Sequence, residues 1–223
     1  MNETGVQTVS VSAGARYPLF LLAVFAVIFV ALGIAPLYRQ DWLLENLVLG
    51  VALVVFIATY QRMRFSNLAY TLLFIFFSVH EVGAHYTYSL VPYDRWIENL
   101  GGVALTQTLG FGRNHYDRLI HFGYGLLVTV PAIELLRRVA PPSGTWRWLL
   151  PPLFILSHSA IYELVEWAAA TVFGGGLGLA YVGAQGDIWD SQKDMACAAS
   201  GAVLAMLIIA ASGALRRRAA RTV

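Results

Sequence analysis

The sequence has few charged residues, and this scarcity excludes several classes of protein. Asp, Glu, Lys and Arg make up 13% of its 223 residues, about half the share found in ordinary soluble domains. The formal net charge is only +2, and no stretch interleaves basic with aromatic residues, so we expect no nucleic acid among its partners. With the single cysteine Cys197, the chain cannot form a disulfide framework, and its redox compartment cannot be read from cysteine usage.

What the sequence has instead is a 58% share of hydrophobic residues, collected in long uncharged runs. A helix needs about 20 apolar residues to cross a bilayer core of ~30 Å. We therefore predict an all-α, polytopic membrane protein, a single transmembrane domain built as a bundle of about six helices. The predicted spans are residues 17–35, 43–60, 66–86, 117–138, 149–173 and 190–215.

The first span has an alternative interpretation as a secretory signal peptide, because Ala31, Leu32 and Gly33 resemble a small-residue cleavage site. Its apolar stretch is longer than the usual run of about 7–15 residues in such peptides, and only Arg16 precedes it. A retained helix is therefore the favoured interpretation.

Basic residues near the ends of the spans predict the orientation, because Lys and Arg accumulate in cytoplasmic loops. One side of the membrane would carry ten of them, and the other side five. The larger group is Arg16, Arg62, Arg64, Arg137, Arg138, Arg147, Arg216, Arg217, Arg218 and Arg221, and the smaller is Arg39, Arg95, Arg113, Arg118 and Lys193. We therefore expect both termini in the cytoplasm.

Ionisable residues within the spans gather towards the end of the bundle that this orientation places outside. Residues at i,i+3 or i,i+4 share a helix face, and four spans carry such a pair. The pairs are Glu81 with His85, Asp117 with His121, Glu163 with Glu166, and Asp190 with Asp194. An ionised side chain at the bilayer centre costs at least about 2.5 kcal/mol, so such groups turn inwards. We expect the four faces to converge on one site.

Histidines with several carboxylates are a ligand set for zinc, iron or manganese, and helices of a bundle can share such a site. The candidate ligands of a divalent metal ion are His80, Glu81, His85, His121, Glu163, Glu166, Asp187, Asp190 and Asp194. The candidate catalytic acids and bases are Asp117, His121, Glu163, Glu166, Asp190 and Asp194. Helix dipoles also favour acids at helix N-termini, which leaves a structural role open for the three aspartates of the second set.

Two further features lie on the same side of the membrane. The connection of residues 87–116 is long for so small a bundle, and it is interpreted either as a lid over a site or as an interfacial amphipathic segment. In the last span, Cys197, Gly201 and Ala205 form a stripe of small residues that favours a close helix contact. We expect this contact to bring Asp190 and Asp194 to His121 and Glu166, while Lys193 turns outward.

Four segments in combination are similar to the YjdF-type inner-membrane family. They are residues 80–88 (HEVGAHYTY), 114–118 (NHYDR), 163–167 (ELVEW) and 186–195 (GDIWDSQKDM). The resemblance runs from about Tyr60 to the end of the last span. It implies a multi-pass protein of the bacterial inner membrane with six or so helices, and it supplies no activity, substrate or cofactor.

A fainter resemblance is to the VanZ-like membrane proteins. Their motif D-K-x-x-H-F is similar to residues 117–122 (DRLIHF), with an arginine in place of the lysine. Their motifs E-x-x-Q and D-x-x-x-N are similar to residues 163–166 (ELVE) and 190–194 (DSQKD), each with an acid in place of the amide. The additional carboxylates of this chain would suit a cation.

Two functions remain open from the sequence. One is a metal-dependent enzyme that acts on a lipid or envelope precursor. The other is a small transporter or channel for a cation or a proton-coupled solute. The chain lacks paired discontinuous helices in corresponding halves, the sign of inverted-repeat transporters, and this favours an enzyme or binding protein. The lipid bilayer is the expected partner in either case.

Overall fold

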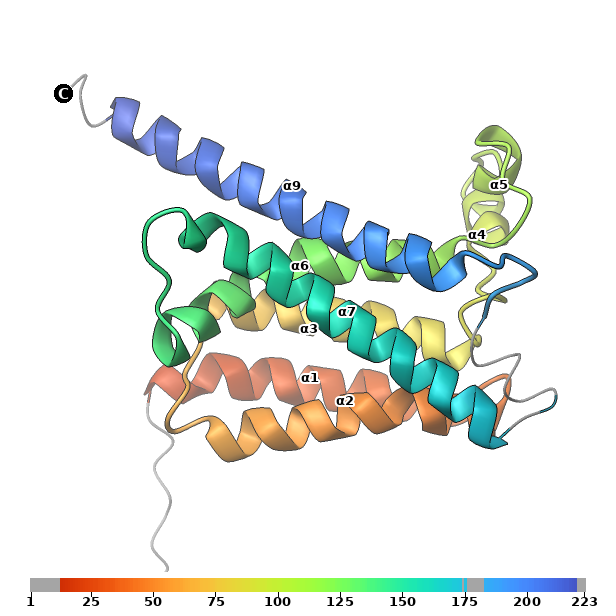
Figure 1. The fold of residues 1–223 in the computed structure, drawn as a ribbon. Helices are drawn as coiled ribbons and strands as arrows, with labels where there is room; N and C mark the ends of the chain where they lie inside the picture. Colours follow the sequence, from red (N-terminus) through yellow and green to blue (C-terminus); the bar gives the residue numbers. More distant parts are fainter. Residues whose placement is uncertain (1–12, 174, 176–182, 220–223) are drawn as a thin grey trace, which may run out of the picture.

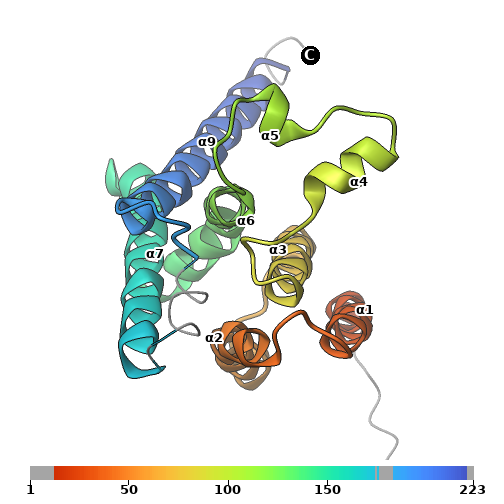
Figure 2. The same cartoon turned by 90° about the vertical axis from the view of Figure 1, so that its right-hand side faces the viewer.

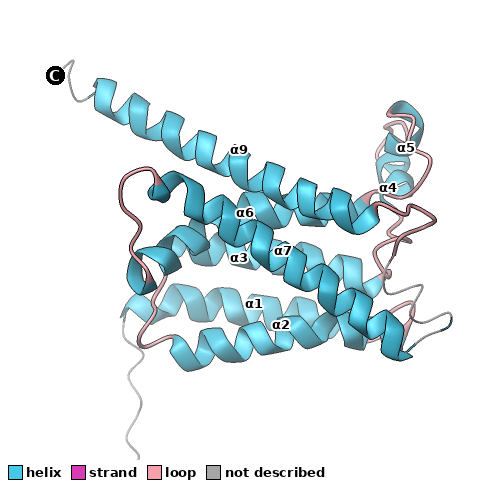
Figure 3. Cartoon of the chain, viewed as in Figure 1, coloured by secondary structure: helices cyan, strands magenta, loops and turns pink. Residues whose placement is uncertain are grey.

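Six long helices run side by side through the structure (Figures 1 and 3). This computed structural model describes residues 13–173, 175 and 183–219, and every regular element within them is helical. After a short 3-10 turn, η1 (Ala13–Ala15), the long helices are α1 (Arg16–Gly33), α2 (Arg39–Thr59), α3 (Asn67–His85), α6 (Tyr116–Val139), α7 (Trp146–Phe173) and α9 (Asp190–Ala219). Each contains a stretch long and apolar enough to cross a membrane. The prediction of an all-α membrane protein with six spans is confirmed.

Helix α2 begins earlier than predicted, and this difference from the predicted spans matters for the site. This helix begins at Arg39 and not at residue 43, because three polar residues precede the apolar run that hydropathy detects. The earlier start places Asp41 and Glu45 one turn apart within the helix. Their side chains face into the bundle, and the two residues are only 3% and 5% exposed.

Helix α6 lies at the centre of the bundle and packs against α3, α7 and α9 (Figure 2). Its contact with α9 depends on two glycines. A Cβ atom at Gly125 of α6 would lie 1.9 Å from the carbonyl oxygen of Ala198, and one at Gly201 of α9 would lie 2.1 Å from that of Phe122. The predicted small-residue contact in the last span is therefore present at Gly201, and α6 is the helix it approaches.

Each of the six long helices has one end at the same side of the bundle, which we call the polar end. Helices α2, α6 and α9 begin there, and α1, α3 and α7 end there (Figure 1). The chain between α1 and α2 is tied to this end, because the Leu37 N–H donates to the carbonyl oxygen of His85 over 2.8 Å. The first turns of α6 and α9 and the last turns of α7 consequently face one another.

The long connection from α3 to α6 contains two short helices, α4 (Tyr93–Asn99) and α5 (Leu105–Thr108). Neither helix buries a residue. The buried part is the turn that precedes them, where Thr87 and Tyr88 adopt left-handed backbone angles with φ of 52° and 50°. This turn folds Tyr88 back onto α3, where its hydroxyl forms a hydrogen bond with Nδ1 of His80. Only this turn, and not α4 or α5, lies over the core of the bundle.

Candidate metal centre

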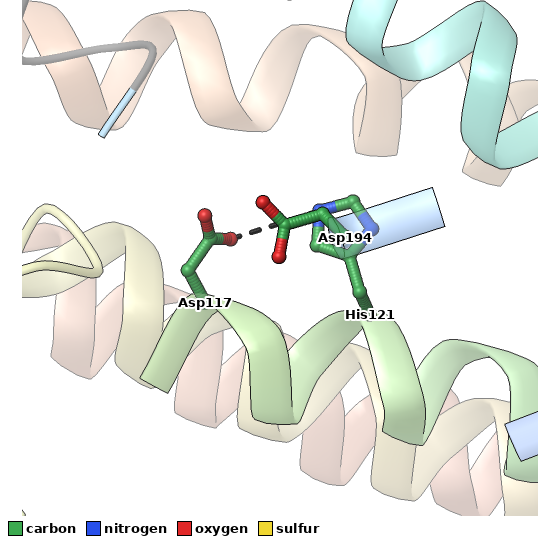
Figure 4. Close-up of side chains that lie close together, drawn as sticks. All are labelled: Asp117, His121 and Asp194. Atoms are coloured by element: carbon green, nitrogen blue, oxygen red, sulfur yellow. Dashed lines mark ion pairs between the residues drawn. The ribbon is translucent and has the colours of Figure 1, made fainter. Parts of the chain in front are cut away.

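Three side chains from α6 and α9 converge at the polar end. Asp117 and His121 lie one turn apart on α6, and Asp194 lies one turn into α9. Each offers one ligand atom, and these atoms all lie within 4.8 Å of one another. Figure 4 shows Asp117 and His121 on one helix with the Asp194 carboxylate beside them, and a dashed line marks the ion pair between Nε2 of His121 and Oδ1 of Asp117, which are 3.7 Å apart. This spacing allows one cation to contact all three.

Helix α7 adds Glu163 to this cluster. Its Oε1 atom lies 3.4 Å from Nε2 of His121, and both residues are buried. Among the residues that the structure describes, neither Oε1 of Glu163 nor Oδ1 of Asp194 has a hydrogen-bond partner. Buried acceptors without a partner are rare because each leaves its desolvation uncompensated. A cation held between these oxygens would supply that compensation.

The other ring nitrogen of His121 has a partner of its own. Oγ of Ser159 on α7 lies 3.4 Å from Nδ1 of the imidazole. A hydrogen bond at Nδ1 fixes the ring orientation and leaves Nε2 free to act as a ligand, as second-shell partners do in many metal sites. The geometry around His121 is therefore compatible with metal binding through Nε2.

Arginine side chains surround the remaining aspartates of this region. Asp190 Oδ1 lies 2.7 Å from Nη1 of Arg113 and 3.3 Å from Nη2 of Arg118. Asp187 Oδ2 lies 2.5 Å from Arg118 Nη2 and 2.6 Å from Lys193 Nζ. The hydrogen bonds from Lys193 and from the Trp189 N–H hold the pKa of Asp187 well below its ordinary value.

These ion pairs change the predicted ligand set. Asp187 and Asp190 are already compensated by basic side chains, so they brace the start of α9 against the start of α6. The expectation that Asp190 meets His121 and Glu166 differs from the structure for this reason, whereas Asp194 does meet His121. Lys193, which is 48% exposed at its side chain, turns outward as expected.

The ionisable residues of α3 do not join the cluster. His80 is bound to Tyr88, and the fully buried Glu81 lies beside Trp42 and Asn46 of α2. Nδ1 of His85 lies 2.7 Å from the carbonyl oxygen of Leu32 in α1. Residues at i and i+4 are about 40° apart around a helix, so this pair of α3 can face two different neighbours. The predicted convergence of four polar faces is thus limited to α6, α7 and α9.

A cavity of about 360 Å³ opens from the cluster into the bundle between α2, α3, α6 and α7. Its polar wall lies at one end and includes Glu45, His80, Asp117 and His121. The rest is lined mainly by aromatic and aliphatic side chains, among them Phe56, Phe65, Phe76, Phe77, Phe154 and Leu135. The shape and polarity suit a ligand with one polar end and a long apolar part.

Asp41, Glu45 and Glu166 form a second group of acids beside the cluster. Glu45 accepts a hydrogen bond of 2.8 Å from the hydroxyl of Tyr162, which links α2 to α7. Asp41 and Glu45 were not among the predicted site residues. Their i,i+4 spacing is the signal that identified the other pairs, and it would have found them had the second span been extended to Arg39.

Comparisons with known proteins agree with this architecture. The model of a family described as "Predicted membrane protein (DUF2238)" matches residues 17–214. Inner membrane protein YjdF of Escherichia coli (strain K12) is 36% identical over 179 residues, which cover 80% of this chain and 81% of that protein. No solved structure matches. A multi-pass protein of the inner membrane is therefore supported, and the resemblance to VanZ-like proteins stays a prediction.

Proposed function

This chain belongs to the DUF2238 family of membrane proteins, and from its geometry we propose that it is a metal-dependent enzyme acting on a lipid or envelope precursor. One observation carries the proposal: Asp117 and His121 belong to a cation-sized cluster and also line the polar end of an otherwise apolar cavity. A substrate whose apolar part occupies the cavity would have its polar group beside the cluster.

Asp117, His121 and Asp194 would hold the cation. Two carboxylates and one imidazole suit zinc or manganese, and a set of three protein ligands leaves a position for water or substrate. A bound divalent cation can polarise a substrate oxygen or lower the pKa of a bound water. The donor set of this chain therefore fits hydrolysis or group transfer at a carbonyl or phosphoryl centre.

Glu163 is the residue in place to move a proton. Its Oε1 atom is 3.4 Å from Nε2 of His121, and this oxygen has no hydrogen-bond partner among the described residues. A carboxylate in this position can accept a proton from a water at the cluster and return it to a leaving group. The same oxygen could instead complete the coordination of the cation. If Glu163 only transfers protons, Glu163→Gln should keep metal binding. If Glu163 is a ligand, the same change should weaken metal binding.

The predicted orientation would place the polar end at the outer face of the inner membrane. With both termini in the cytoplasm, the polar end of the bundle faces the periplasm. A lipid-linked substrate in the outer leaflet would then reach the cluster with its head group, and its chain would enter the cavity among the aromatic side chains.

Cation transport is the second candidate, and the number of buried acids at the polar end favours it. Those acids do not continue through the membrane, however. Among the described residues, the acid at the opposite end is Glu134, whose carboxylate accepts hydrogen bonds from the backbone and hydroxyl of Ser66. The long intervening part of the cavity is mainly apolar, which favours a lipid chain over an ion path.

The metal requirement can be tested on the detergent-purified full-length chain. Equilibrium dialysis against Zn²⁺ or Mn²⁺, followed by elemental analysis, should give bound metal, and His121→Ala and Asp194→Asn should each lose the ion held at the cluster. Glu98→Gln is the matched control, because Glu98 is an exposed acid of α4 outside the cluster.

The enzymatic activity is tested on the same samples. The metal-loaded chain should convert a lipid of an inner-membrane extract, and a chelator should stop this conversion, as detected by mass spectrometry. Absence of bound metal in the wild-type chain would exclude the proposal, and metal-dependent ion flux in liposomes without lipid turnover would select transport.

A further inference from the structure

A second, smaller cavity lies beside the cluster at the polar end. It measures about 10 Å³ and is lined by Asp41 and Glu45 of α2, Asp117 of α6 and Glu166 of α7, together with Thr87 and Tyr88 of the buried turn. A volume of this order holds about one water-sized body. Four carboxyl groups from three helices therefore surround a space for a single small occupant.

The carboxyl groups around this space are withdrawn from solvent. Asp41, Glu45 and Glu166 are 3%, 5% and 8% exposed. Glu45 lies close enough to Asp117 and Asp41 for their charges to repel, and the same holds for Glu166 with Asp117 and Glu45. Buried carboxylates at this proximity are unfavourable unless a proton or a cation compensates them.

Basic side chains do not compensate the three acids Asp41, Glu45 and Glu166. Arg113, Arg118 and Lys193 are engaged with Asp187 and Asp190, and no ion pair to Asp41, Glu45 or Glu166 occurs in the part of the chain that the structure describes. Oδ2 of Asp41, a residue 3% exposed and in the cavity wall, has no hydrogen-bond partner among those residues. An unpartnered, buried carboxylate oxygen in the wall of a water-sized cavity is an acceptor that a bound cation would satisfy.

The ligand chemistry of this space differs from that of the first cluster. The polar groups of the side chains that line it are all oxygens: four carboxyl groups and the hydroxyls of Thr87 and Tyr88, of which the Tyr88 hydroxyl is already hydrogen-bonded to His80. Oxygen-only sets are typical of Mg²⁺, Ca²⁺ and Mn²⁺. The first cluster contains the imidazole of His121 and suits zinc or manganese.

Asp117 belongs to both spaces. It lies within the cluster of His121 and Asp194, and it also lines the small cavity with Glu45 and Glu166. A carboxylate has two oxygens, so one aspartate can contact a cation on each side. Shared carboxylates are a common feature of two-metal centres, in which the pair of cations stabilises both the attacking and the leaving oxygen of a displacement.

We propose that Asp41, Glu45, Asp117 and Glu166 form a second cation site for a hard divalent ion, and that Asp117 bridges it to the cluster of His121 and Asp194. This inference deepens the proposed function and rests on it through the shared residue Asp117. The centre would hold two cations, one with a nitrogen ligand and one with oxygen ligands only.

Manganese is the probe, because Mn²⁺ accepts both kinds of site. Dialysis of the full-length chain against Mn²⁺ in excess, with elemental analysis, should give two ions per chain. The double variant Asp41→Asn with Glu45→Gln should keep one ion, and so should His121→Ala. The control Glu98→Gln should keep both. Addition of excess Mg²⁺ should displace one Mn²⁺ from the wild type and none from the Asp41/Glu45 double variant.

Electron paramagnetic resonance provides a second readout on the same samples. Two Mn²⁺ ions that share a carboxylate couple magnetically, so the wild-type spectrum should differ from that of isolated Mn²⁺ ions. Each one-site variant should return the spectrum of an isolated ion. If the Asp41/Glu45 double variant does not fold, Asp41→Asn alone and the Mg²⁺ competition on the wild type still decide the question.

The outcomes separate this inference from the proposed function. One ion per chain in the wild type, lost in His121→Ala and unaffected by the Asp41/Glu45 changes, overturns the second site and leaves the proposed enzyme standing. Two ions that both persist in the double variant also overturn the second site. No bound ion in the wild type overturns both.

Discussion

Gly125 of α6 and Ala198 of α9 are so close that a Cβ atom at Gly125 would lie 1.9 Å from the carbonyl oxygen of Ala198. No side chain fits between the two backbones at this point. The contact lies one turn from His121 on α6 and one turn from Asp194 on α9. The distance between these two candidate ligands is consequently set by a helix packing that only glycine permits.

Gly125→Ala should therefore disrupt the candidate metal centre without changing any ligand. The added methyl group forces the helices apart, which typically costs about 1–3 kcal/mol in overpacked interiors, and it should lower metal affinity at least tenfold. Gly123→Ala is the matched control on the same helix, because nothing lies within 4 Å of a Cβ at that position. Thermal unfolding and Mn²⁺ binding measure the two effects. Equal behaviour of the two variants would show that the site does not depend on this contact.

Glu163→Gln and Glu166→Gln should reduce function more than they reduce insertion or stability. Neutral side chains cost less to place at membrane depth than ionised ones, so a purely structural pair would leave a chain that is as stable as the wild type or more stable. We expect normal expression of both variants, with chelator-sensitive lipid turnover lowered at least tenfold. Full turnover in both would exclude these acids from the site.

The fold could be predicted from the sequence because membrane insertion imposes a simple rule of length and hydropathy. The same rule missed the start of α2, since Arg39, Gln40 and Asp41 are polar although they are helical and Asp41 is buried. Hydropathy placed the predicted boundary at residue 43, so Asp41 lay outside the predicted span and Glu45 lay at its edge without its partner one turn away.

Helical spacing identified the core of the candidate site but could not choose partners across helices. It grouped Asp117 with His121 correctly, because both belong to one helix. The bracing of Asp190 by Arg113 depends on the path of the long connection, which spacing within a helix does not describe. For the same reason, the pattern could not tell that His85 faces α1.

The orientation of the bundle remains a prediction that reporter fusions can test. The distribution of ten basic residues against five predicts that a fusion after Val223 is active only with a cytoplasmic reporter. A fusion within the exposed tip of the connection, at Gly101, should be active only with a periplasmic reporter. The reverse pattern would move the polar end to the cytoplasmic face and exclude a substrate in the outer leaflet.

The bracing around Asp187 should give the start of α9 a defined pH dependence. Lys193 and the Trp189 N–H lower the pKa of this carboxyl in the folded state. A group with a depressed pKa contributes its stabilisation above the unfolded value of about 3.9 and loses it as the pH falls towards the folded value. The hydrogen-exchange protection factor at the start of α9, which is the intrinsic exchange rate divided by the observed rate at each pH, should therefore be constant at neutral and mildly acidic pH and fall below about pH 4. Asp187→Asn should show a low protection factor at every pH, and a wild-type loss of protection centred well above about pH 4 would point to a different group.

Asp190→Asn and Asp194→Asn should have opposite effects, because the two aspartates one turn apart have different partners. Asp190 pairs with Arg113 at 2.7 Å, and the Arg113 side chain is only 11% exposed. Asp190→Asn leaves the Arg113 guanidinium without its carboxylate partner. We therefore expect a loss of stability of about 1–3 kcal/mol and a change in Mn²⁺ affinity of less than about threefold. Asp194 Oδ1 lies 4.0 Å from Nε of Arg118, forms no hydrogen bond among the described residues, and lies beside Asp117 and His121. Because this ion pair is long, Asn should change stability by less than about 1 kcal/mol while lowering Mn²⁺ affinity at least tenfold. Both amides can still favour the start of α9, so loss of helix capping cannot produce this contrast. Equal effects of the two variants on stability and on binding would show that both acids act only at the start of the helix.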